Sequence, residues 1–582
     1  MAGQETYAFS GFTLDVGERR LSKGGQPIAL APKAFDLLVA LVRRPGRLVS
    51  KQELLESVWV QAFVEEGILA VHVSALRKAL GDTSRRARCI ETVSRSGYRF
   101  IAPVIEQSVD RRVIPGRWSI AVLPARSPAT GVESDRLIGL AITDALIDRL
   151  GRFDPLVVRP TAAVHGHGSH ADPAAVGRML RTDAIVDWSF ERLPDRVHLS
   201  ARLVRSDDGA PLLSGEFDDS VGRSAADAVA DAVASHFGAM LRPRSRDRSD
   251  AVGAPPRVAR SRPEVYELCG RGRSHLLSAS MFEVPKAIDA FRAAVDLDAA
   301  YAPAHAGLAL AYCAQAAMRV APPLDAYRDA RAAALRALAM DDDSADAQVA
   351  LGTVLFFGEW DWRGAERSLL RALEMNPSHV QGYLMYGRLL DALGRPHEAL
   401  DMKLRAFECD PLSPLVHVQM ALSYWNQRRY DDAIEWANKA LDLDPRHLLA
   451  REFLAGAYMK KGDFERYMAE VITHAESFGV APDFLGPMKD AYAAGGRAGV
   501  ARYSLQQLDS NPRRAPAFQL ALLAADAGDT DRAFLYLDRA ILGRDPALVD
   551  LAVAPQWDSL RADPRFEQYV ARMGLAHTDR PE

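Results

Sequence analysis

The sequence predicts a multidomain protein whose three folded sections belong to different fold classes. Residues 1–105 are expected to be α+β, residues 117–241 α/β, and residues 265–575 an all-α repeat. Strand and helix patterns follow one another in the first two sections, whereas a pattern recurs every 34 residues in the third. Residues 242–264 are rich in Arg, Ser, Asp and Pro, a composition that contributes little to a core and is typical of a linker.

The charge of the chain is unevenly distributed. Its 582 residues include 72 Lys and Arg and 76 Asp and Glu, which gives a net charge of −4. Residues 1–105 hold 15 basic and 10 acidic residues, or +5, which leaves 57 basic and 66 acidic residues, or −9, for the remainder. The total argues against a nucleic-acid binder driven by overall basic charge. The first section alone has the sign that nucleic acid requires.

The sequence predicts neither a disulfide framework nor a membrane span. The longest charge-free stretch, residues 299–318, is mostly Ala and contains Pro, His and Gln, so we expect part of a soluble helical pair. The start of the chain lacks the basic and apolar regions of a secretory signal. We therefore expect a cytoplasmic protein in a reducing compartment. Its four cysteines lie far apart and form no CxxC pair: Cys89, Cys269, Cys313 and Cys409.

The first section begins with a predicted sheet and two helices. Residues 7–30 alternate apolar and polar side chains, with turn signals at Gly17 and at Gly24-Gly25, which predicts a short antiparallel sheet. Residues 31–46 form a helix that places Phe35, Leu38, Leu41 and Val42 on one face and ends at Pro45-Gly46. A second helix follows Ser50, and Glu53 three residues later completes a capping box.

A third helix and a hairpin complete this section. The helix is predicted from about Glu65 to Leu80, with Leu69, Val73 and Leu76 also on its buried stripe. Residues 90–104 predict two strands joined by a tight turn from Ser94 to Gly97. A sheet, three helices and a C-terminal hairpin in this order describe a winged helix-turn-helix.

Three stretches of this section resemble the OmpR/PhoB-type winged-helix domain of bacterial transcription regulators. They are LAPKAFDLLVALVRRPGRLVSKQELLESVW, VHVSALRKALGD and IETVSRSGYRF, and the resemblance covers nearly all of residues 7–104. It implies that the third helix enters the major groove of double-stranded DNA and that the hairpin, or wing, lies near the minor groove.

The third helix carries most of the candidate DNA-binding residues. Opposite its buried stripe it presents short side chains, which allow close approach to base edges, and Ala or Val can meet thymine methyl groups. Arg77 and Lys78 can hold a phosphate or a guanine edge, and Arg95 of the wing can enter a narrow groove. The family's arrangement places His72 beside the DNA backbone. The complete candidate set is Ser50, Gly67, Ala70, Val71, His72, Ser74, Arg77, Lys78, Arg95 and Tyr98, with Ala75 on the same face.

These candidates also have structural interpretations. Arg77 and Lys78 are cations at a helix C-terminus, where they are favoured in any protein. Arg95 can be a solvated turn residue, and His72 is close enough to the buried stripe to be packed in the core.

The third helix also departs from the best-known family members. Those members carry more Arg where this chain has Gly67, Ser74 and Ala75. We therefore expect contacts to the DNA backbone and shape to matter more than direct base readout.

Residues 117–241 predict an α/β domain. Strand, helix, strand, helix and strand are followed by a hairpin that turns at Asp207-Asp208-Gly209 and by a helix to about Met240. The segments SIAVLP and VGRMLRTDAIV and the DDG hairpin resemble the TolB-N-terminal-like domain. The resemblance implies no particular ligand residue.

The third section repeats with a period of 34 residues. The dipeptides Asn376-Pro377, Asp410-Pro411 and Asp444-Pro445 mark the period. Small residues let paired helices approach closely, and the Pro ends the second helix of each pair. The section resembles tetratricopeptide repeats over about 265–475, with residues 531–566 as a degenerate capping repeat. Three columns of small residues keep the period: Ala365, Ala399 and Ala433; Ala372, Ala406 and Ala440; Gly387, Ala421 and Ala455.

No enzyme motif, metal site or cofactor site is predicted. The sequence lacks a phosphate loop, an HExxH helix and a GxSxG elbow. His165, His167 and His170 are separated by Gly and Ser and lack a nearby carboxylate pair, so we expect a loop there rather than a metal site. An enzyme centred on residues 117–241 has no motif to support it.

The sequence therefore predicts a transcription regulator that binds promoter DNA through its third helix and wing. The repeats would sense or recruit a protein partner or mediate self-association, and we expect a homodimer or tandem sites on DNA. The loop from Trp59 to Glu66 occupies the place where relatives contact RNA polymerase, so recruitment of polymerase is a further expectation. The alternative is an interaction scaffold whose winged helix has weak or no affinity for DNA, which Ser74 and Ala75 would also fit.

Overall fold

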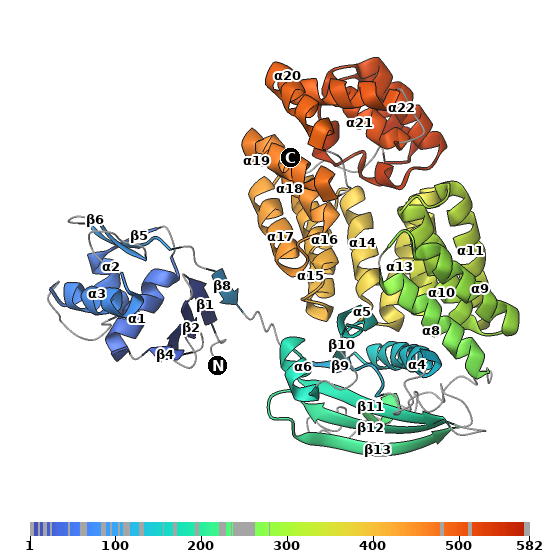
Figure 1. Ribbon diagram of the computed structural model, residues 1–582, viewed down its shortest axis with the longest axis horizontal. Helices are drawn as coiled ribbons and strands as arrows, with labels where there is room; N and C mark the ends of the chain where they lie inside the picture. The colour runs from blue at the N-terminus through green and yellow to red at the C-terminus, as the bar shows by residue number, and fades with distance from the viewer. Residues whose placement is uncertain are drawn as a thin grey trace. The chain divides into compact units, whose positions relative to one another are not determined.

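The computed structural model divides into two compact units, residues 1–115 and 116–582 (Figure 1). It describes residues 5–575 except for 10–11, 16–19, 24–25, 29, 45–46, 59–66, 83–88, 94–95, 103–104, 109–116, 127–132, 155, 167–171, 193–196, 220–228, 234–235, 237–261, 279, 478–481 and 510–514.

The first unit contains two small sheets and three helices around one core. The predicted sheet, helices and hairpin are confirmed, and Phe35, Leu38, Leu41 and Val42 are all buried. The sheets have the strand orders β4-β3-β2-β1-β8 and β5-β7-β6. The elements are β1 Glu5–Phe9, β2 Phe12–Asp15, β3 Arg20–Lys23, β4 Gln26–Ile28, α1 Pro32–Val42, β5 Leu48–Ser50, α2 Lys51–Val58, α3 Gly67–Leu80, β6 Ile90–Val93, β7 Gly97–Phe100 and β8 Ile105–Ser108.

The last strand of the first unit extends beyond residue 105. Strand β8 pairs antiparallel with β1, with Ala8 opposite Ile105. The predicted end of the section at residue 105 falls at the start of this strand. A fragment that is to fold with its complete sheet must therefore extend beyond residue 108.

The second unit begins with a five-stranded mixed sheet. Its order is β10-β9-β11-β12-β13; β10, β9 and β11 are parallel and the remaining pairs are antiparallel. The predicted hairpin is confirmed, with Gly209 in its turn at φ +72°. The elements are β9 Trp118–Val122, α4 Glu133–Gly151, β10 Leu156–Val158, α5 Thr161–Val164, α6 Pro173–Met179, β11 Ala184–Arg192, β12 Val197–Arg205 and β13 Pro211–Asp219.

The remainder of the second unit is an array of paired helices. The first two columns of small residues are buried between them, and in the third Gly387 and Ala421 are buried while Ala455 is half-buried. The helices are α8 Pro263–Leu277, α9 Val284–Leu297, α10 Ala302–Ala317, α11 Pro323–Met340, α12 Ala345–Thr353 with a π-helical extension Val354–Glu359, α13 Trp362–Met375, α14 Val380–Ala392, α15 Pro396–Cys409, α16 Pro414–Asn426, α17 Tyr430–Leu443, α18 Leu448–Lys461, α19 Phe464–Ser477, α20 Pro482–Asp509, α21 Ala517–Ala527, α22 Thr530–Leu542 and α23 Pro564–Arg572, with short 3₁₀ turns at Pro546–Asp550 and Pro555–Trp557.

The turns between successive helix pairs hold the edge of the mixed sheet. Strand β10 is an edge strand, whose free backbone groups need partners. The Val158 amide donates to Ser378 Oγ at 3.1 Å, and Ser378 Oγ donates to the Leu156 carbonyl at 3.3 Å. Arg159 is buried and donates to the carbonyls of Glu408 and Cys409 at 2.6 and 2.9 Å. The Pro-containing turns at 376–378 and near 410 are therefore also docking points for the sheet.

Helices α4 and α8 join the sheet to the array a second time. A Cβ at Gly270 would lie 1.9 Å from the Leu137 carbonyl oxygen, so only glycine permits this close approach. Arg273 of α8 reaches Asp144 at 2.5 Å and Asp346 at 2.8 Å. The predicted α/β section and the array thus share one core and form a single compact unit.

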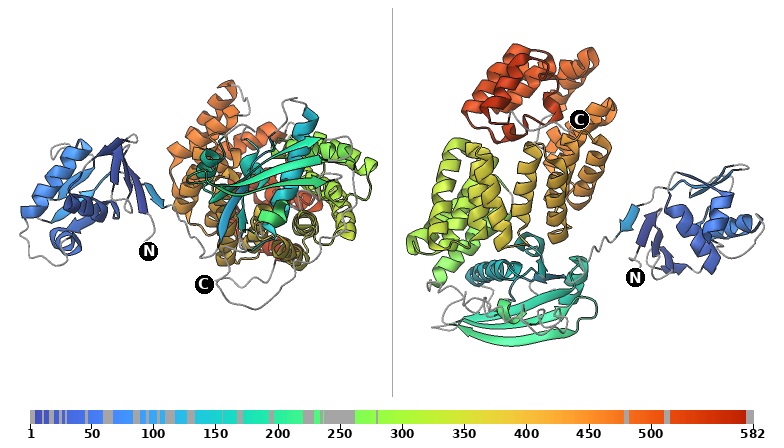
Figure 2. Two further views of the ribbon diagram at one scale, coloured as in Figure 1. Left: turned by 90° about the horizontal axis from the view of Figure 1, so that it is seen from below. Right: turned by 180° about the vertical axis from the view of Figure 1, so that it is seen from behind.

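The C-terminal segment packs at the other ends of the array helices. Asp545 pairs with Arg319 at 2.7 Å, and Asp550 pairs with Arg388 at 2.6 Å. The Trp362 indole donates to the Met573 carbonyl at 2.8 Å. The sheet therefore lies against one edge of the array and α20–α23 lie against the other (Figures 1 and 2).

Two further expectations concern membrane spans and disulfides. Within those residues, no helix is long and apolar enough to cross a membrane. All four cysteines are buried free thiols.

The docking turn near residue 410 generates a pH-dependent prediction. Burial raises the pKa of the Asp410 carboxyl to about 6, against the opposing charge of Arg159 and a hydrogen bond from the Leu412 amide. The folded state therefore binds this proton more tightly than the unfolded state. Stability is lost as the pH rises from about 4 to about 6, and the penalty above that range is at most about 3 kcal/mol.

We expect Asp410→Asn to remove this penalty, because the amide oxygen can accept the same hydrogen bond without a charge. The melting temperature of the variant, relative to the original chain, should rise between pH 4 and pH 7 and then level off. Thermal unfolding across this pH range checks the result. A difference in melting temperature between the two proteins that stays the same at every pH would show that folding does not raise the pKa of the Asp410 carboxyl.

Candidate nucleic-acid interface

Helix α3 separates cleanly into a buried and an exposed face. Both faces are as predicted. The buried residues are Leu69, Val73, Leu76 and Leu80. The exposed residues are Gly67, Ala70, Val71, Ser74, Ala75 and Lys78. Val71 is 66% exposed, although it is a large apolar side chain. An exposed face of short side chains with a cation in the last turn has the shape that major-groove entry requires.

Arg77, at the edge of this face, is bound to the wing. Its Nη2 donates to the Ile90 carbonyl and to Thr92 Oγ1, both at 2.8 Å, and its Nε approaches the same carbonyl at 3.3 Å. The guanidinium thus ties the last turns of α3 to strand β6. This geometry gives Arg77 a structural role that sequence reasoning had not identified, distinct from a phosphate contact.

Asp82 forms a second connection between α3 and the wing. Gly81 ends the helix at φ +65°, and the buried Asp82 follows it. The Asp82 carboxylate accepts hydrogen bonds from the Cys89 and Ile90 amides, both at 2.9 Å. Sequence reasoning did not single out Asp82. The available signal was a Gly-Asp pair at the helix end, eight residues before a strand.

The wing itself is a two-stranded ladder joined to β5. Strand β6 pairs with β7, and Glu91 and Arg99 face each other across the pair at 3.1 Å. A Cβ at Gly97 would lie 2.1 Å from the Val49 carbonyl oxygen, so β5 and β7 can approach this closely only at glycine. Tyr98 is 7% exposed and belongs to the core. Its side chain therefore offers little surface for the DNA contact that was predicted for it.

The capping box at the start of α2 is confirmed. The Ser50 amide donates to Glu53 Oε2 at 2.9 Å, and the Glu53 amide donates to Ser50 Oγ at 3.2 Å. The bond from the Ser50 amide, followed by a hydrogen bond from the Ser50 side chain, lowers the pKa of the Glu53 carboxyl. The Ser50 side chain therefore serves first as a helix cap.

The structure describes some of the remaining candidate residues and not others. His72 is half-buried between the two faces of α3. Arg95 and the loop from Trp59 to Glu66 lie outside the described residues. Of the histidine cluster, His165 is half-buried, and burial lowers its pKa; the other two histidines lie outside the described residues.

Two kinds of family model match the chain. Residues 25–100 match "Transcriptional regulatory protein, C terminal". Residues 361–414 and 414–447 match models of the tetratricopeptide repeat. The resemblance of residues 117–241 to the TolB-N-terminal-like domain stays a prediction.

Similar proteins include several transcription regulators. The phosphate regulon transcriptional regulatory protein PhoB of Klebsiella pneumoniae is 37% identical over 103 residues, which are 18% of this chain and 44% of that protein. The transcriptional activator CadC of Escherichia coli (strain K12) is 31% identical over 119 residues, 20% of this chain and 23% of that protein. The transcriptional regulator HilA of Salmonella typhimurium is 28% identical over 191 residues, 32% of each chain.

These matches are confined to part of each chain. This chain spans less than half the length of the curated relatives named above. A solved structure, the DNA-binding domain of E. coli CadC, is 28% identical, with a TM-score of 0.17; the match covers 18% of this chain and 99% of that domain. The family models and the sequence identity to PhoB show that the first unit carries an OmpR/PhoB-type DNA-binding domain, and the family models show that tetratricopeptide repeats follow in the second unit.

Proposed function

We propose that this protein is a cytoplasmic transcription regulator that binds promoter DNA through the exposed face of α3 and the wing. The observation that most directly supports this proposal is the exposed face of α3. Gly67, Ala70, Ser74 and Ala75 leave room for close approach to a DNA groove, and Val71 offers an apolar contact for a thymine methyl group. Lys78 supplies the cation for a phosphate.

The structure supports a division of roles among the predicted DNA-binding residues. Gly67, Ala70, Val71, Ser74 and Lys78 would contact DNA directly because their side chains, or the glycine backbone, are exposed. Ser50, Arg77 and Tyr98 would act by holding α2, the wing and the core in place. His72 and Arg95 remain proposed DNA contacts, beside the backbone and in the wing.

The tetratricopeptide section supplies the proposed input. Such arrays bind protein partners along their helices, so the repeats would recruit or sense a partner, or a second copy of the chain. The neutral-to-acidic balance of the residues after 105 fits this division, because that part has no net attraction for DNA.

One prediction about DNA binding concerns Lys78. We expect residues 1–115 to bind mixed-sequence duplex DNA with an affinity that falls steeply with salt, since each phosphate contact releases counterions. Lys78→Ala should weaken binding and reduce the slope of log affinity against log salt by about 0.9. Arg20→Ala is the matched control, because it removes one exposed cation from β3 in the other sheet.

The measurement is a fluorescence-anisotropy titration at several salt concentrations. Equal slopes for Lys78→Ala and Arg20→Ala would show that α3 does not hold a phosphate through Lys78. Absent or salt-insensitive binding by the original fragment would favour the interaction scaffold instead.

Another prediction about this unit concerns Arg77. Arg77→Met keeps the aliphatic stem but removes the hydrogen bonds to Ile90 and Thr92, and it leaves the Ile90 carbonyl without this donor. We expect a loss of about 1–3 kcal/mol in stability together with weaker DNA binding. Lys78→Met should weaken binding with no comparable loss, because Lys78 is exposed.

Chemical denaturation and DNA titration of both variants check this pair. If Arg77→Met lowers affinity and leaves the free energy of unfolding unchanged, Arg77 contacts DNA directly and the structural role is wrong.

A further inference from the structure

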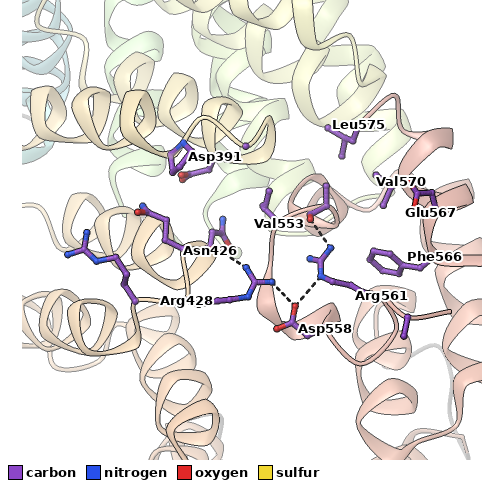
Figure 3. A pocket seen from close by; sticks show the side chains of 16 residues that line it. Asp391, Asn426, Arg428, Val553, Asp558, Arg561, Phe566, Glu567, Val570 and Leu575 are labelled. Carbon is purple, nitrogen blue, oxygen red and sulfur yellow. Dashed lines mark hydrogen bonds and ion pairs between the residues drawn. The ribbon is translucent and has the colours of Figure 1, made fainter. Parts of the chain in front are cut away.

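A cavity of about 930 Å³ lies between the repeat array and the C-terminal segment. One wall comes from the turns after α14 and α16, including Gly394, Pro396 and Arg428. The other comes from residues 552–575, including Val553 and Phe566 (Figure 3). Its volume is in the range of small-molecule sites, which form preferentially where two structural parts meet.

The two ends of this cavity differ in chemistry. Phe566, Val570 and Leu575 line one end with apolar surface. Arg428 lines the other end and reaches Asp558, whereas Arg561 lies between the two ends, with its guanidinium carbon 5.3 Å from the centroid of the Phe566 ring (Figure 3). A ligand that matches both ends needs an apolar body and a polar group.

The polar end carries an excess of positive charge. Arg428 Nη2 and Arg561 Nε both reach the Oδ1 atom of Asp558, at 2.7 and 3.0 Å. Lys460, which does not itself line the cavity, lies 3.6 Å from the other oxygen of the same carboxylate. Three cations thus surround one carboxylate, which leaves an excess of two positive charges.

The hydrogen bonds of the two arginines show which of them can take a ligand. Arg561 also donates to the carbonyls of Ala552 and Ala554, at 2.8 and 3.1 Å. Among the described residues, the Arg428 side chain donates once more, to the Asn426 carbonyl at 3.3 Å, and it is 45% exposed. A guanidinium has five N–H donors, so Arg428 retains donors for an anion.

The other carboxylates of the lining do not cancel this charge. Asp391 is buried and bonded to Lys403 and to Ser423. Glu567 lies beside Val570, away from Arg428 (Figure 3). The polar end therefore keeps its positive excess.

Asn426 adds an unsatisfied polar group to the same wall. The residue is 8% exposed, and neither polar atom of its side-chain amide has a hydrogen-bond partner among the described residues. A buried amide without a partner carries a free-energy cost, and such groups mark places where a water or ligand atom completes the structure.

Arg428 itself is held in an unusual backbone conformation. It adopts φ +60° at a turn where Gly394 and Gly462, 34 residues before and after it, adopt similar positive φ values. A non-glycine residue pays a backbone cost there that glycine avoids. The side chain at this turn thus reaches Asp558 of the opposite wall at a backbone cost that Gly394 and Gly462 avoid and that Trp360, 34 residues before Gly394 and at φ +58°, shares.

We propose that this cavity binds a small organic anion with an apolar body, such as an aliphatic or aromatic carboxylate. The anionic group pairs with Arg428, and the apolar body lies against Phe566, Val570 and Leu575. The site goes beyond the proposed DNA-binding function and does not depend on it. Because its two walls belong to different parts of the second unit, a bound ligand holds the C-terminal segment on the array.

The test uses the full chain and octanoate, with its uncharged amide octanamide as the matched ligand. We expect calorimetry to give a single octanoate site with a Kd of about 1 mM, as ligand efficiency allows for a molecule of this size, and roughly tenfold weaker binding of octanamide. Equal affinities for the two ligands, or no octanoate binding up to about 10 mM, would overturn the proposal.

Two variants locate the site. Arg428→Met should reduce octanoate affinity to that of octanamide, whereas Arg336→Met, an exposed residue of α11 outside the cavity, should leave it unchanged. Val553→Trp should abolish binding of both ligands by filling the space between the walls; Val553 is only half-buried, so the fold should tolerate the change. Octanoate binding that survives Val553→Trp places the ligand elsewhere and contradicts the proposal.

Discussion

The connection between the end of α3 and the wing fixes the geometry of the DNA-binding unit. Arg77 donates to the backbone and a hydroxyl of β6, and Asp82 accepts two amides at the start of that strand. The helix and the wing are otherwise joined through the core and through β5. Because the two elements proposed to contact DNA are fixed to each other, the α3 face and the wing present one surface rather than two independent ones.

Much of the fold follows from sequence patterns, and several predictions that relied on them are confirmed. The stripe of Leu69, Val73, Leu76 and Leu80, the capping box at Ser50, and the 34-residue columns all depend on contacts close in sequence or repeated at a fixed interval. Such contacts are visible in a single sequence. Strand β8 extends the first unit beyond residue 105 by pairing with β1, and no local pattern marks this contact between residues about a hundred positions apart.

The side-chain roles were harder to predict for the same reason. The sequence around Arg77 is the same whether its side chain contacts a phosphate or a strand carbonyl. Only the position of β6 in the fold shows which contact it makes. Tyr98 alternates with its neighbours in a way that fits either face of the wing. Ser378 and Arg159 bond backbone groups more than two hundred residues away, so no local pattern marks them. These contacts make the sheet and the array one unit.

The exposed face of α3 is the centre of this account, and thiol protection tests it most directly. All four native cysteines are buried, so a single new thiol can be followed. Ser74→Cys on α3 and Ser278→Cys on the second unit are both exposed positions. Mixed-sequence duplex DNA at low salt should slow maleimide modification of the full chain at Ser74→Cys and leave Ser278→Cys unaffected. Equal modification rates at Ser74→Cys with and without bound DNA would contradict the account.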